Sequence, residues 1–431
     1  MGPRPTSEFG RVAPGSERRW RTSNGAKCTC SPGEDSDRRA LSACSERIVL
    51  ASGVTSQTRI LILNWRDAKN PDAGGAEHHL HEIGSRWSHE GHEVTLLCAG
   101  FPNGPREEVV SGIRVRRMGN ANTVYLHALR YLTSSTKMAN YDVVFDSINT
   151  VPFFAPLVSK APVVAQIYSI ENRLVLFDEI PLRKFLLFVG AYIASSSIPR
   201  IYRECEAITI SQYSKAHLVA EGFCPEMVHV AYPGISDAFR ELLDASPEAR
   251  RPNHTIVYLG RLKKYKGVQD IIFALHLIKK EIPDVKLLLI GRGDYEEQIR
   301  MLVSKLGLGE TVKFCGFVSE RQKALLLKSA SLYLCTSRDE GGWTISAAEA
   351  MAAGVPILVT ESQRDVIEDG SNGYLLPDSR PATIAEKVCG VLRDPSEWER
   401  LSENAEAFSG QFNWDITASV TMSTLVSATS K

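Results

Sequence analysis

Two segments of the sequence combine charged side chains with glycines in an order that could bind a diphosphate. The first, GRLKKYKG (residues 260–267), follows an apolar run and places Arg261 and Lys266 in the turn before the next predicted helix. Cations and the unpaired amides at a helix N-terminus both favour negative charge, so this turn suits a diphosphate. A solvated basic turn is the alternative interpretation, because short basic turns are common.

The second segment, SRDEGGWTISAAEAMAAGVP (residues 337–356), places an acidic pair, two glycines and a tryptophan directly before an alanine-rich helix. Gly354 and Pro356 end that helix, and its first amides could face a phosphate. Glu349, about halfway along it, could accept hydrogen bonds from the vicinal hydroxyls of a ribose. The alternative is that Glu349 lies on the surface, as most charged residues do.

Other polar clusters carry weaker signals. GRGDYE (residues 291–296) has only part of the glycine pattern of a dinucleotide-binding loop, and neither opening strand leads into GxGxxG, which disfavours a dehydrogenase. His78, His79 and His81 lie close together in the sequence but lack carboxylate partners. We therefore interpret them as residues of a helix surface and of the edge of a cleft, and not as a metal site.

The order of apolar runs and helical segments predicts two α/β units. The first opens with TRILILN (residues 58–64), a glycine turn and a helix, and further strands are predicted at YDVVFD, PVVAQIY, AITIS and VHVAY. The alternation restarts at HTIVYLG (residues 254–260) and continues through VKLLLIG, VKFCGF and SLYLCTS. Two such units, joined around YPGISDAF (residues 232–239), predict two facing Rossmann-like domains with a ligand cleft between them.

The composition disfavours several classes of function. Fifty basic and 50 acidic residues balance, so the overall charge does not point to a nucleic-acid partner. Nine cysteines without CxxC spacing favour a reducing, cytoplasmic setting over a zinc site or a disulfide framework. Residues 1–57 are rich in Ser, Gly, Pro and basic residues and are predicted to be disordered. A targeting peptide there is disfavoured, because acidic residues precede its short apolar run.

The motifs together resemble the retaining glycosyltransferases of family 4, which have the GT-B fold. In the second unit the resemblance rests on GRLKKYKG, GFVSERQK, the acidic-Gly-Trp loop, EAMAAGVPILV and GSNGYLLP. In the first unit NWRDAKNPDAGGAEHHLHEI, INTVPFF, PVVAQI and YPGISDAF are similar to a bacterial and archaeal branch. The resemblance implies an acceptor-binding domain at residues 58–235 and a donor-binding domain at residues 236–410. It also implies a C-terminal helix within residues 411–431 that packs back on the first domain.

The resemblance also implies roles for the residues that match the family's motifs. Arg261 and Lys266 would hold the donor diphosphate, Glu349 the nucleotide ribose and Glu340 the transferred sugar. The donor-site loops would contribute Gly74, Gly75, Gly260, Gly341, Gly342, Trp343 and Thr344. Two cations would stabilise the departing diphosphate where negative charge develops. No metal ion or other cofactor is therefore expected besides the co-substrate, a UDP- or GDP-linked sugar.

Two features depart from the family's pattern. Family members usually have seven residues between two glutamates in this region, whereas eight separate Glu340 from Glu349. A bulge at Gly341–Gly342 would let Glu340 reach the sugar; without a bulge the sugar-binding carboxylate is missing. Tyr168, also a catalytic candidate, stands where related sequences commonly have histidine. It could donate a hydrogen bond but carries no cation near neutral pH, and a buried aromatic at a strand end is the alternative.

The acceptor is less clearly indicated. PLRKFLLFVGAYIASSSIP (residues 181–199) combines Arg183 and Lys184 with an apolar run that is too short to span a bilayer. Contact with a membrane surface would suit a lipid-linked acceptor, and a domain-packing helix is the alternative.

The sequence thus predicts a retaining hexosyltransferase that acts on a glycan, a glycolipid or a lipid-linked acceptor. We expect it in the cytoplasm, or peripherally on the inner face of the membrane, with no nucleic-acid partner. The alternative is a nucleotide-sugar-binding protein that has lost turnover and acts through a partner.

Overall fold

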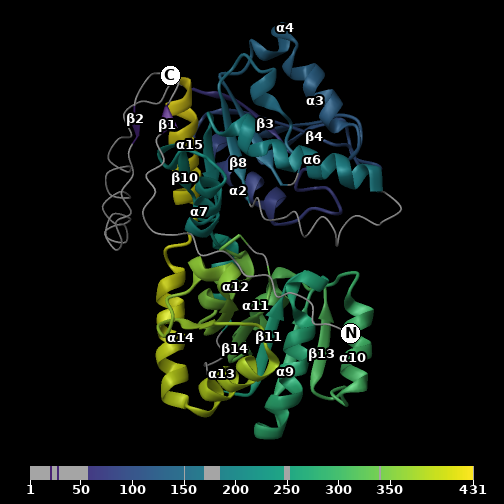
Figure 1. Cartoon of the computed structure of the whole chain (residues 1–431), viewed down its shortest axis with the longest axis vertical. Helices are drawn as coiled ribbons and strands as arrows, with labels where there is room; N and C mark the ends of the chain where they lie inside the picture. Colours follow the sequence, from purple (N-terminus) through teal and green to yellow (C-terminus); the bar gives the residue numbers. More distant parts are fainter. Residues whose placement is uncertain are drawn as a thin grey trace, which may run out of the picture. The chain divides into compact units, whose positions relative to one another are not determined.

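The structure is a computed structural model, and it describes residues 20–21, 27–28, 57–149, 151–168, 185–246, 253–338 and 341–430. Within the first 56 residues it describes only the strands β1 (Trp20–Arg21) and β2 (Lys27–Cys28), which pair antiparallel. The predicted disorder of residues 1–57 therefore lies almost entirely outside the described residues. Residues 57–431 form a separate compact unit, and Figure 1 shows its helices and strands.

The first domain is built on an eight-stranded sheet with the strand order β10-β9-β8-β7-β3-β4-β6-β5. All neighbouring strands are parallel except β5 and β6. The central strands are apolar and buried on both faces, which is typical of parallel sheets. The strands are β3 (Arg59–Leu63), β4 (Glu93–Cys98), β5 (Glu107–Val110), β6 (Ile113–Arg117), β7 (Val143–Ile148), β8 (Val163–Ile167), β9 (Glu206–Thr209) and β10 (Val228–Val230).

The hairpin of β5 and β6 was not predicted. Its two-residue turn consists of Ser111 and Gly112, which both have positive φ values, of 48° and 83°. Such turns match the right-handed twist of the paired strands. The dipeptide and the alternation in IRVRR were signals that could have revealed this edge of the sheet.

Helices cover both faces of the first sheet. Successive residues of a strand point to opposite faces, and in β3 Ile62 belongs to one apolar cluster while Leu63 belongs to another. The first cluster is completed by α2 (Gly75–His89) and by α15 (Trp414–Thr429) from the far end of the chain. The remaining helices of this domain are α3 (Val124–Leu132), α4 (Ser135–Met138), η1 (Ala155–Leu157), α6 (Phe185–Tyr202), α7 (Gln212–Ala220) and η3 (Pro225–Met227).

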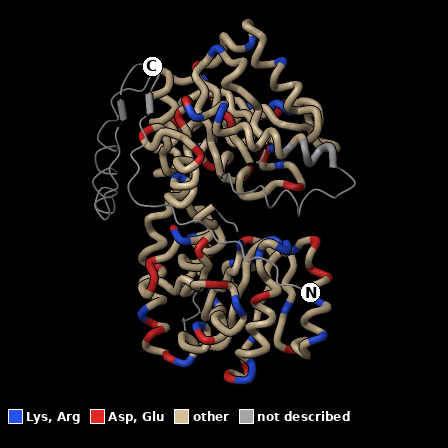
Figure 2. Tube along the Cα trace, viewed as in Figure 1, with Lys and Arg blue, Asp and Glu red and all other residues tan. Residues whose placement is uncertain are grey.

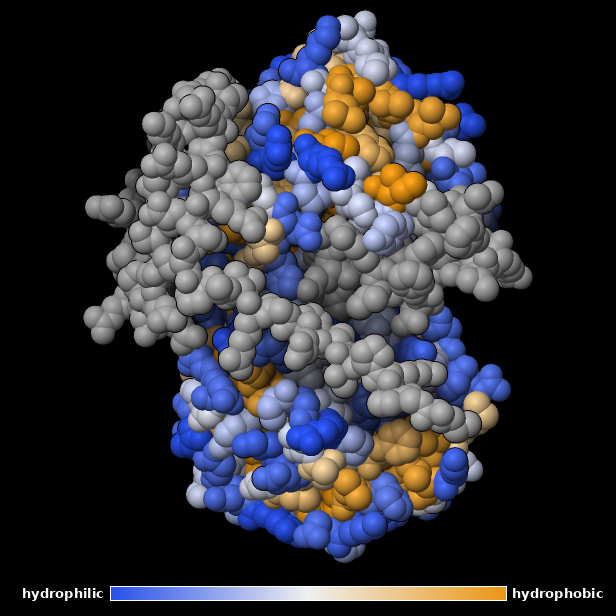
Figure 3. Space-filling view, in the orientation of Figure 1, coloured by the Kyte–Doolittle hydropathy of each residue, from blue (hydrophilic) through white to orange (hydrophobic). Residues whose placement is uncertain are grey.

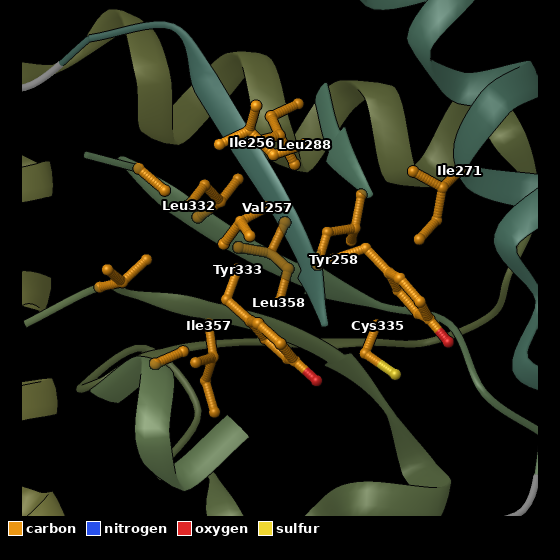
Figure 4. Close-up of a cluster of buried hydrophobic side chains, with 14 of the residues drawn as sticks. Ile256, Val257, Tyr258, Ile271, Leu288, Leu332, Tyr333, Cys335, Ile357 and Leu358 are labelled. Carbon is orange, nitrogen blue, oxygen red and sulfur yellow. The ribbon is translucent and has the colours of Figure 1, made fainter. Parts of the chain in front are cut away.

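The second domain is built on a six-stranded, fully parallel sheet with the order β13-β12-β11-β14-β15-β16. Figure 4 shows its core, in which Tyr258 and Tyr333 lie among aliphatic side chains. The predicted strands of this domain, with ILVT (residues 357–360) after Pro356 among them, are confirmed, and β16 is an addition. The strands are β11 (Thr255–Leu259), β12 (Lys286–Ile290), β13 (Val312–Gly316), β14 (Leu332–Cys335), β15 (Ile357–Thr360) and β16 (Gly373–Leu376).

Helices alternate with these strands, as the sequence predicted for a Rossmann-like unit. They are α8 (Asp237–Asp244), η4 (Lys264–Lys266), α9 (Val268–Glu281), α10 (Glu296–Lys305), α11 (Glu320–Lys328), α12 (Ile345–Ala352), η5 (Glu361–Val366), α13 (Pro381–Arg393) and α14 (Pro395–Ser409). Acidic and basic residues are interspersed over this domain and do not gather by sign (Figure 2).

Each sheet contains a point at which the order of strands reverses. In the second sheet β11 lies between β12 and β14, and the chain adds β15 and β16 beyond β14. The loops after β11 and β14 therefore lead in opposite directions, and ligands of open α/β sheets bind where such loops diverge. In the first sheet the order of strands reverses at β3, which lies between β4 and β7. The fold thus directs attention to the loops after β3, β11 and β14.

Among the described residues, no helix has the length and apolarity needed to cross a membrane. The predicted surface segment at residues 181–199 coincides largely with α6. Arg183 and Lys184 lie outside the described residues, so the basic part of that prediction stays a prediction.

The contact of α15 with the first domain yields a testable stability difference. Leu425 is fully buried in the cluster shared by α2 and α15. We expect Leu425→Ala to lower the free energy of unfolding by about 3 kcal/mol, because truncation leaves a cavity. Ser423→Ala, on the exposed side of the same helix, should change it by less than about 0.5 kcal/mol. Urea denaturation followed by circular dichroism measures both, and equal effects would contradict the described packing.

Candidate functional site

The loop after β11 brings the two predicted diphosphate ligands to one tyrosine. Gly260 directly follows the strand, and the exposed Arg261 comes next. Arg261 Nη2 lies 3.5 Å from Tyr265 Oη, and Lys266 Nζ lies 5.2 Å from the centroid of the Tyr265 ring. Tyr265, which the sequence analysis did not single out, therefore contacts both cations.

This loop also packs tightly against the loop after β14. Gly267 has a φ of +72°, and a Cβ there would lie 2.3 Å from the carbonyl oxygen of Thr336. Thr336 Oγ1 donates a hydrogen bond to Gly267 O over 2.8 Å, and Arg338 N donates to Tyr265 O over 3.0 Å. Only glycine fits this approach, which joins the cation-bearing loop to the loop that leads towards α12.

The acidic-Gly-Trp loop is described from Gly341 onward. Asp339 and Glu340 lie outside the described residues, so the sugar-binding role of Glu340 stays a prediction. Gly341 and Gly342 both have positive φ values, of 62° and 84°. A Cβ on Gly342 would lie 2.5 Å from the Cβ of Tyr213, so a side chain at this position would displace α7.

Two serines at the start of α7 hold this loop. The side chain of Ser211 donates a hydrogen bond to Gly341 O, and Ser214 Oγ lies 2.8 Å from the same oxygen. Ser214 Oγ also lies 3.1 Å from the carbonyl oxygen of Tyr168. The end of β8, the start of α7 and the glycine loop therefore meet at one point.

Trp343 and Thr344 lead from the glycine loop into α12. Trp343 is buried and packs edge-on against Phe412, with ring centroids 5.6 Å apart. Thr344, half-buried, precedes the first turn of α12, and its Oγ1 lies 2.9 Å from Ser346 Oγ. α12 starts at Ile345, two residues after Trp343.

Glu349 is buried in α12, which contradicts the alternative of a surface position. Its Oε1 accepts a hydrogen bond from Lys323 Nζ of α11 over 2.6 Å. This partner was not predicted from the sequence, although Lys323 ends the motif GFVSERQK. The carboxylate is thus held in one position by a cation from a neighbouring helix.

Burial and mutual attraction oppose each other in this pair. Burial raises the pKa of Glu349, and the charge and hydrogen bond of Lys323 limit the rise. Burial by itself would lower the pKa of Lys323, but Glu349 and Glu320 raise it above its ordinary value. The ammonium group 2.6 Å from the carboxylate favours the charged form of both groups and so opposes the effect of burial.

Gly74 and Gly75 form the N-terminus of α2. The amide of Gly74 donates a hydrogen bond to Glu77 Oε2 over 2.7 Å, which satisfies one of the open donors at this helix end. Both glycines are exposed. A Cβ on Gly75 would lie 4.0 Å from Ile345 Cδ1, so the first residues of α2 and α12 are neighbours.

Tyr168 lies at the end of β8 against the first turn of α2. Its hydroxyl lies 3.4 Å from the carbonyl oxygen of Ala76, and its ring is edge-on to the ring of His79, with centroids 5.6 Å apart. Burial raises the pKa of Tyr168 above its ordinary value, so its hydroxyl keeps its proton near neutral pH.

The interpretation of His79 as a surface or cleft-edge residue is wrong. His79 is buried between Tyr168 and Trp414, and burial lowers the pKa of its imidazole to about 3. The helical period puts it on the same face as Leu80, Ile83 and Trp87, which the alternation of histidines concealed. Among the described residues there is no group of three or more potential metal ligands.

A buried ion pair fixes the loop between β3 and α2. Asp67 accepts two hydrogen bonds of 2.8 Å from Arg117 of β6, and Arg117 also pairs with Glu108 over 2.6 Å. Burial by itself would raise the pKa of Asp67, but the hydrogen bonds from Arg117 and the Lys69 amide outweigh it and lower the pKa. This pair, which the sequence analysis also missed, anchors the chain that reaches Gly74 seven residues later.

Breaking this pair tests its contribution. Asp67→Ala removes the carboxylate that accepts two hydrogen bonds from the buried Arg117 cation, and it should lower the free energy of unfolding by about 3–5 kcal/mol. Asp72→Ala, an exposed carboxylate of the same loop, should cost less than about 0.5 kcal/mol. Urea denaturation at neutral pH gives both values, and a small loss in Asp67→Ala would contradict an energetic role of the pair.

The pH dependence follows from the lowered pKa of Asp67. A carboxyl with a lowered folded pKa contributes stability that is complete above its unfolded pKa of about 4 and is lost as the pH falls through the folded value. The stability difference between the wild type and Asp67→Ala should therefore be constant near neutral pH and shrink below about pH 4. A difference that stays constant down to pH 3 would contradict this prediction.

Two family patterns match the chain, one over each domain. The pattern described as Glycosyltransferase Family 4 matches residues 73–239, and the pattern described as Glycosyl transferases group 1 matches residues 239–408. The two patterns meet in α8, which follows the last strand of the first sheet and precedes the first strand of the second.

Two mycobacterial relatives illustrate the similarity. The phosphatidyl-myo-inositol mannosyltransferase of Mycobacterium leprae is 34% identical over 176 residues, which are 40% of this chain and 46% of that protein. The protein of the same name from Mycolicibacterium smegmatis is 25% identical over 368 residues, 81% of this chain and 89% of that protein. Where the alignment with a mycobacterial relative has at least 30% identity, the chain spans about half the length of that relative.

Solved structures share the fold. Sucrose-phosphate synthase from Thermosynechococcus elongatus has a TM-score of 0.67 at 18% identity, over 86% of this chain and 98% of that one. Anabaena HepE, in complex with UDP and glucose, has a TM-score of 0.61 at 21% identity, over 86% of this chain and 100% of that one. The two parallel-sheet domains are thus those of the GT-B fold, and the chain belongs to the group 1 glycosyltransferases of family 4.

Proposed function

We propose that this protein is a retaining glycosyltransferase that moves a hexose from a UDP- or GDP-linked sugar to a hydroxyl group of a glycan, glycolipid or lipid-linked acceptor. The observation that carries the proposal is the contact of Gly267 with Thr336, which joins the loop of Arg261 and Lys266 to the loop that enters α12. The two cations lie on one of these loops, and the helix amides and the buried carboxylate belong to the helix that the other loop enters. A nucleotide diphosphate would use both sets of groups, the cations and amides for its phosphates and the carboxylate for its ribose.

Arg261 and Lys266 would bind the diphosphate and stabilise the charge that develops as it departs. Such stabilisation is largest where the groups are already in place before the reaction. Both side chains contact Tyr265, which restricts their freedom. Together they would supply the charge compensation that a metal ion supplies in other transferases.

Glu349 would accept hydrogen bonds from the ribose hydroxyls. Its carboxylate is held and oriented by Lys323, so little ordering would remain to be done on binding. Gly341, Gly342, Trp343 and Thr344 would border the transferred sugar, with Glu340 as its carboxylate partner. Gly74 and Gly75, beside the start of α12, would close the site from the first domain.

The acceptor proton would pass to the donor's own phosphate, since that oxygen leaves the anomeric carbon on the face where the acceptor arrives. Tyr168 keeps its proton, because burial raises its pKa, and would donate a hydrogen bond at the mouth of the sugar site. This role replaces the cation that a histidine could carry at the same position.

A lipid-linked acceptor is the acceptor class we favour. Leu126 and Leu129 of α3 and Tyr192 and Ile193 of α6 are exposed apolar residues, and Figure 3 shows apolar side chains gathered near α3 and α6. Such residues suit contact with a membrane surface. The two mannosyltransferases named above act, by their names, on a phosphatidyl lipid. The protein would then work at the cytoplasmic side of a membrane.

Calorimetric titration of the protein with UDP and with GDP tests the donor site. We expect one of the two to bind, and Arg261→Ala and Lys266→Ala each to weaken it at least tenfold, since a charge-assisted hydrogen bond contributes about 1.5–3 kcal/mol. Lys280→Ala, an exposed cation in the last turn of α9, should leave the affinity unchanged. Absence of binding by either nucleotide would count against the proposal.

The stereochemical part needs its own measurement. Proton NMR of the first product formed should give an anomeric coupling of the same configuration as the donor sugar. An inverted anomer would refute retention. Binding of a nucleotide sugar without transfer to any acceptor offered would favour the alternative, a binding protein without turnover.

A further inference from the structure

Asp365 of η5 makes three side-chain hydrogen bonds to a different part of the chain. Its carboxylate accepts hydrogen bonds from the backbone amides of Gln212 and Tyr213 and from the hydroxyl of Tyr232. The Tyr213 nitrogen lies 3.3 and 3.4 Å from the two carboxylate oxygens, and the Tyr232 hydroxyl lies 3.1 Å from one of them. Gln212 and Tyr213 are the first residues of α7, whose open amides carry the positive end of the helix dipole. One carboxylate therefore holds a helix start that lies more than 150 residues earlier.

The backbone of the same segment holds the glycine loop. Asp365 N donates a hydrogen bond to Gly342 O over 3.0 Å, and Gly342 N donates to Ser362 O over 2.8 Å. From the other side, Ser211 and Ser214 donate to Gly341 O. The glycine loop is thus fixed between η5 and α7, and Asp365 joins η5 to α7 directly.

Packing of aromatic rings connects the same segments as these hydrogen bonds. Tyr232 packs edge-on against Phe412 with ring centroids 6.2 Å apart, and Phe412 packs edge-on against Trp343. The hydroxyl of the same tyrosine is bound to Asp365. A displaced Tyr232 would therefore shift Trp343, directly before α12, both through the Phe412 ring and through the loop that Asp365 holds.

We propose that Asp365 is a positioning residue that fastens the start of α7 and Tyr232 to the Gly341–Trp343 loop, and so holds the first turn of α12 in place for the donor. Only the effect of these contacts on sugar transfer rests on the proposed function. The hydrogen bonds of the Asp365 carboxylate go to Gln212, Tyr213 and Tyr232, so its effect on the donor would pass through the loop.

The energetics favour a local effect of substitution. Removal of the carboxylate leaves two helix amides and a hydroxyl without their acceptor in a half-buried contact, where an unmet donor is costly. Gly341 and Gly342 have positive φ values, a conformation that glycine does not hold by itself because it populates many others equally well. The loop therefore depends on its partners for order, and loss of one partner should loosen it.

Hydrogen exchange measured by mass spectrometry on the ligand-free protein tests the proposal. In Asp365→Ala we expect exchange to quicken at least tenfold in peptides that contain the start of α7 and the 341–344 loop, with no change in β12. Asp365→Asn retains an acceptor oxygen and should recover most of the protection. Glu361→Ala is the matched control, because Glu361 is an exposed carboxylate of η5 that pairs with the exposed Arg364.

Unchanged exchange at both segments in Asp365→Ala would overturn the proposal. If exchange rises throughout the chain because that variant does not fold, Tyr232→Phe decides, since it removes a single hydroxyl. A smaller rise confined to the same two segments then supports the proposal, and no rise there overturns it.

Kinetics separate positioning from general destabilisation. Where the wild type transfers sugar, kcat of Asp365→Ala should fall at least tenfold while KM for the donor changes less than threefold, because Arg261, Lys266 and Glu349, the proposed ligands of the nucleotide, are untouched. An unchanged kcat would overturn the effect on transfer. If the wild type binds neither UDP nor GDP, the transferase proposal fails, and the exchange measurement still decides the role of Asp365.

Discussion

Gly267 and Thr336 approach so closely that a single added carbon would lie 2.3 Å from a carbonyl oxygen. The contact follows from the parallel pairing of β11 with β14, which brings their carboxyl ends to the same edge of the sheet. Beyond it one loop turns towards α9 and the other towards α12. The proposed phosphate ligands lie on the first loop and the ribose ligand on the helix after the second. Their spacing is therefore set by backbone packing, which a rigid sheet maintains better than mobile side chains could.

Behind these loops the described residues of each domain include a buried ion pair. Asp67 with Arg117 anchors the loop before α2, and Glu349 with Lys323 joins α12 to α11. Desolvation makes such pairs poor sources of net stability, but a charge left without its partner is strongly unfavourable. Each pair thus penalises alternative arrangements of its loop or helix more than it stabilises the fold as a whole. That property suits segments that must keep one geometry.

The sequence indicated the fold well and the site only in part. The central strands of both sheets were predictable because buried apolar runs such as RILIL and KLLLI have no other stable environment. The burial of Glu349 followed from its alanine-rich helix, but its partner Lys323 did not, because the pairing of side chains on different helices leaves no periodic trace. Arg117 and Asp365 were missed for the same reason. His79 was misjudged because the neighbouring histidines concealed the apolar face that it shares with Ile83 and Trp87, against which α15 packs.

The place of α15 also affects how the protein can be made. Its residues complete a core whose other parts, β3 and α2, leave the ribosome more than 300 residues earlier. At about 5–20 residues per second, translation of the intervening chain takes roughly 15–70 s. During that interval the apolar face that awaits α15 is open to solvent, while the second domain already has all its strands. The nascent first domain is therefore a natural client for chaperones, and it can finish folding only after its neighbour has emerged.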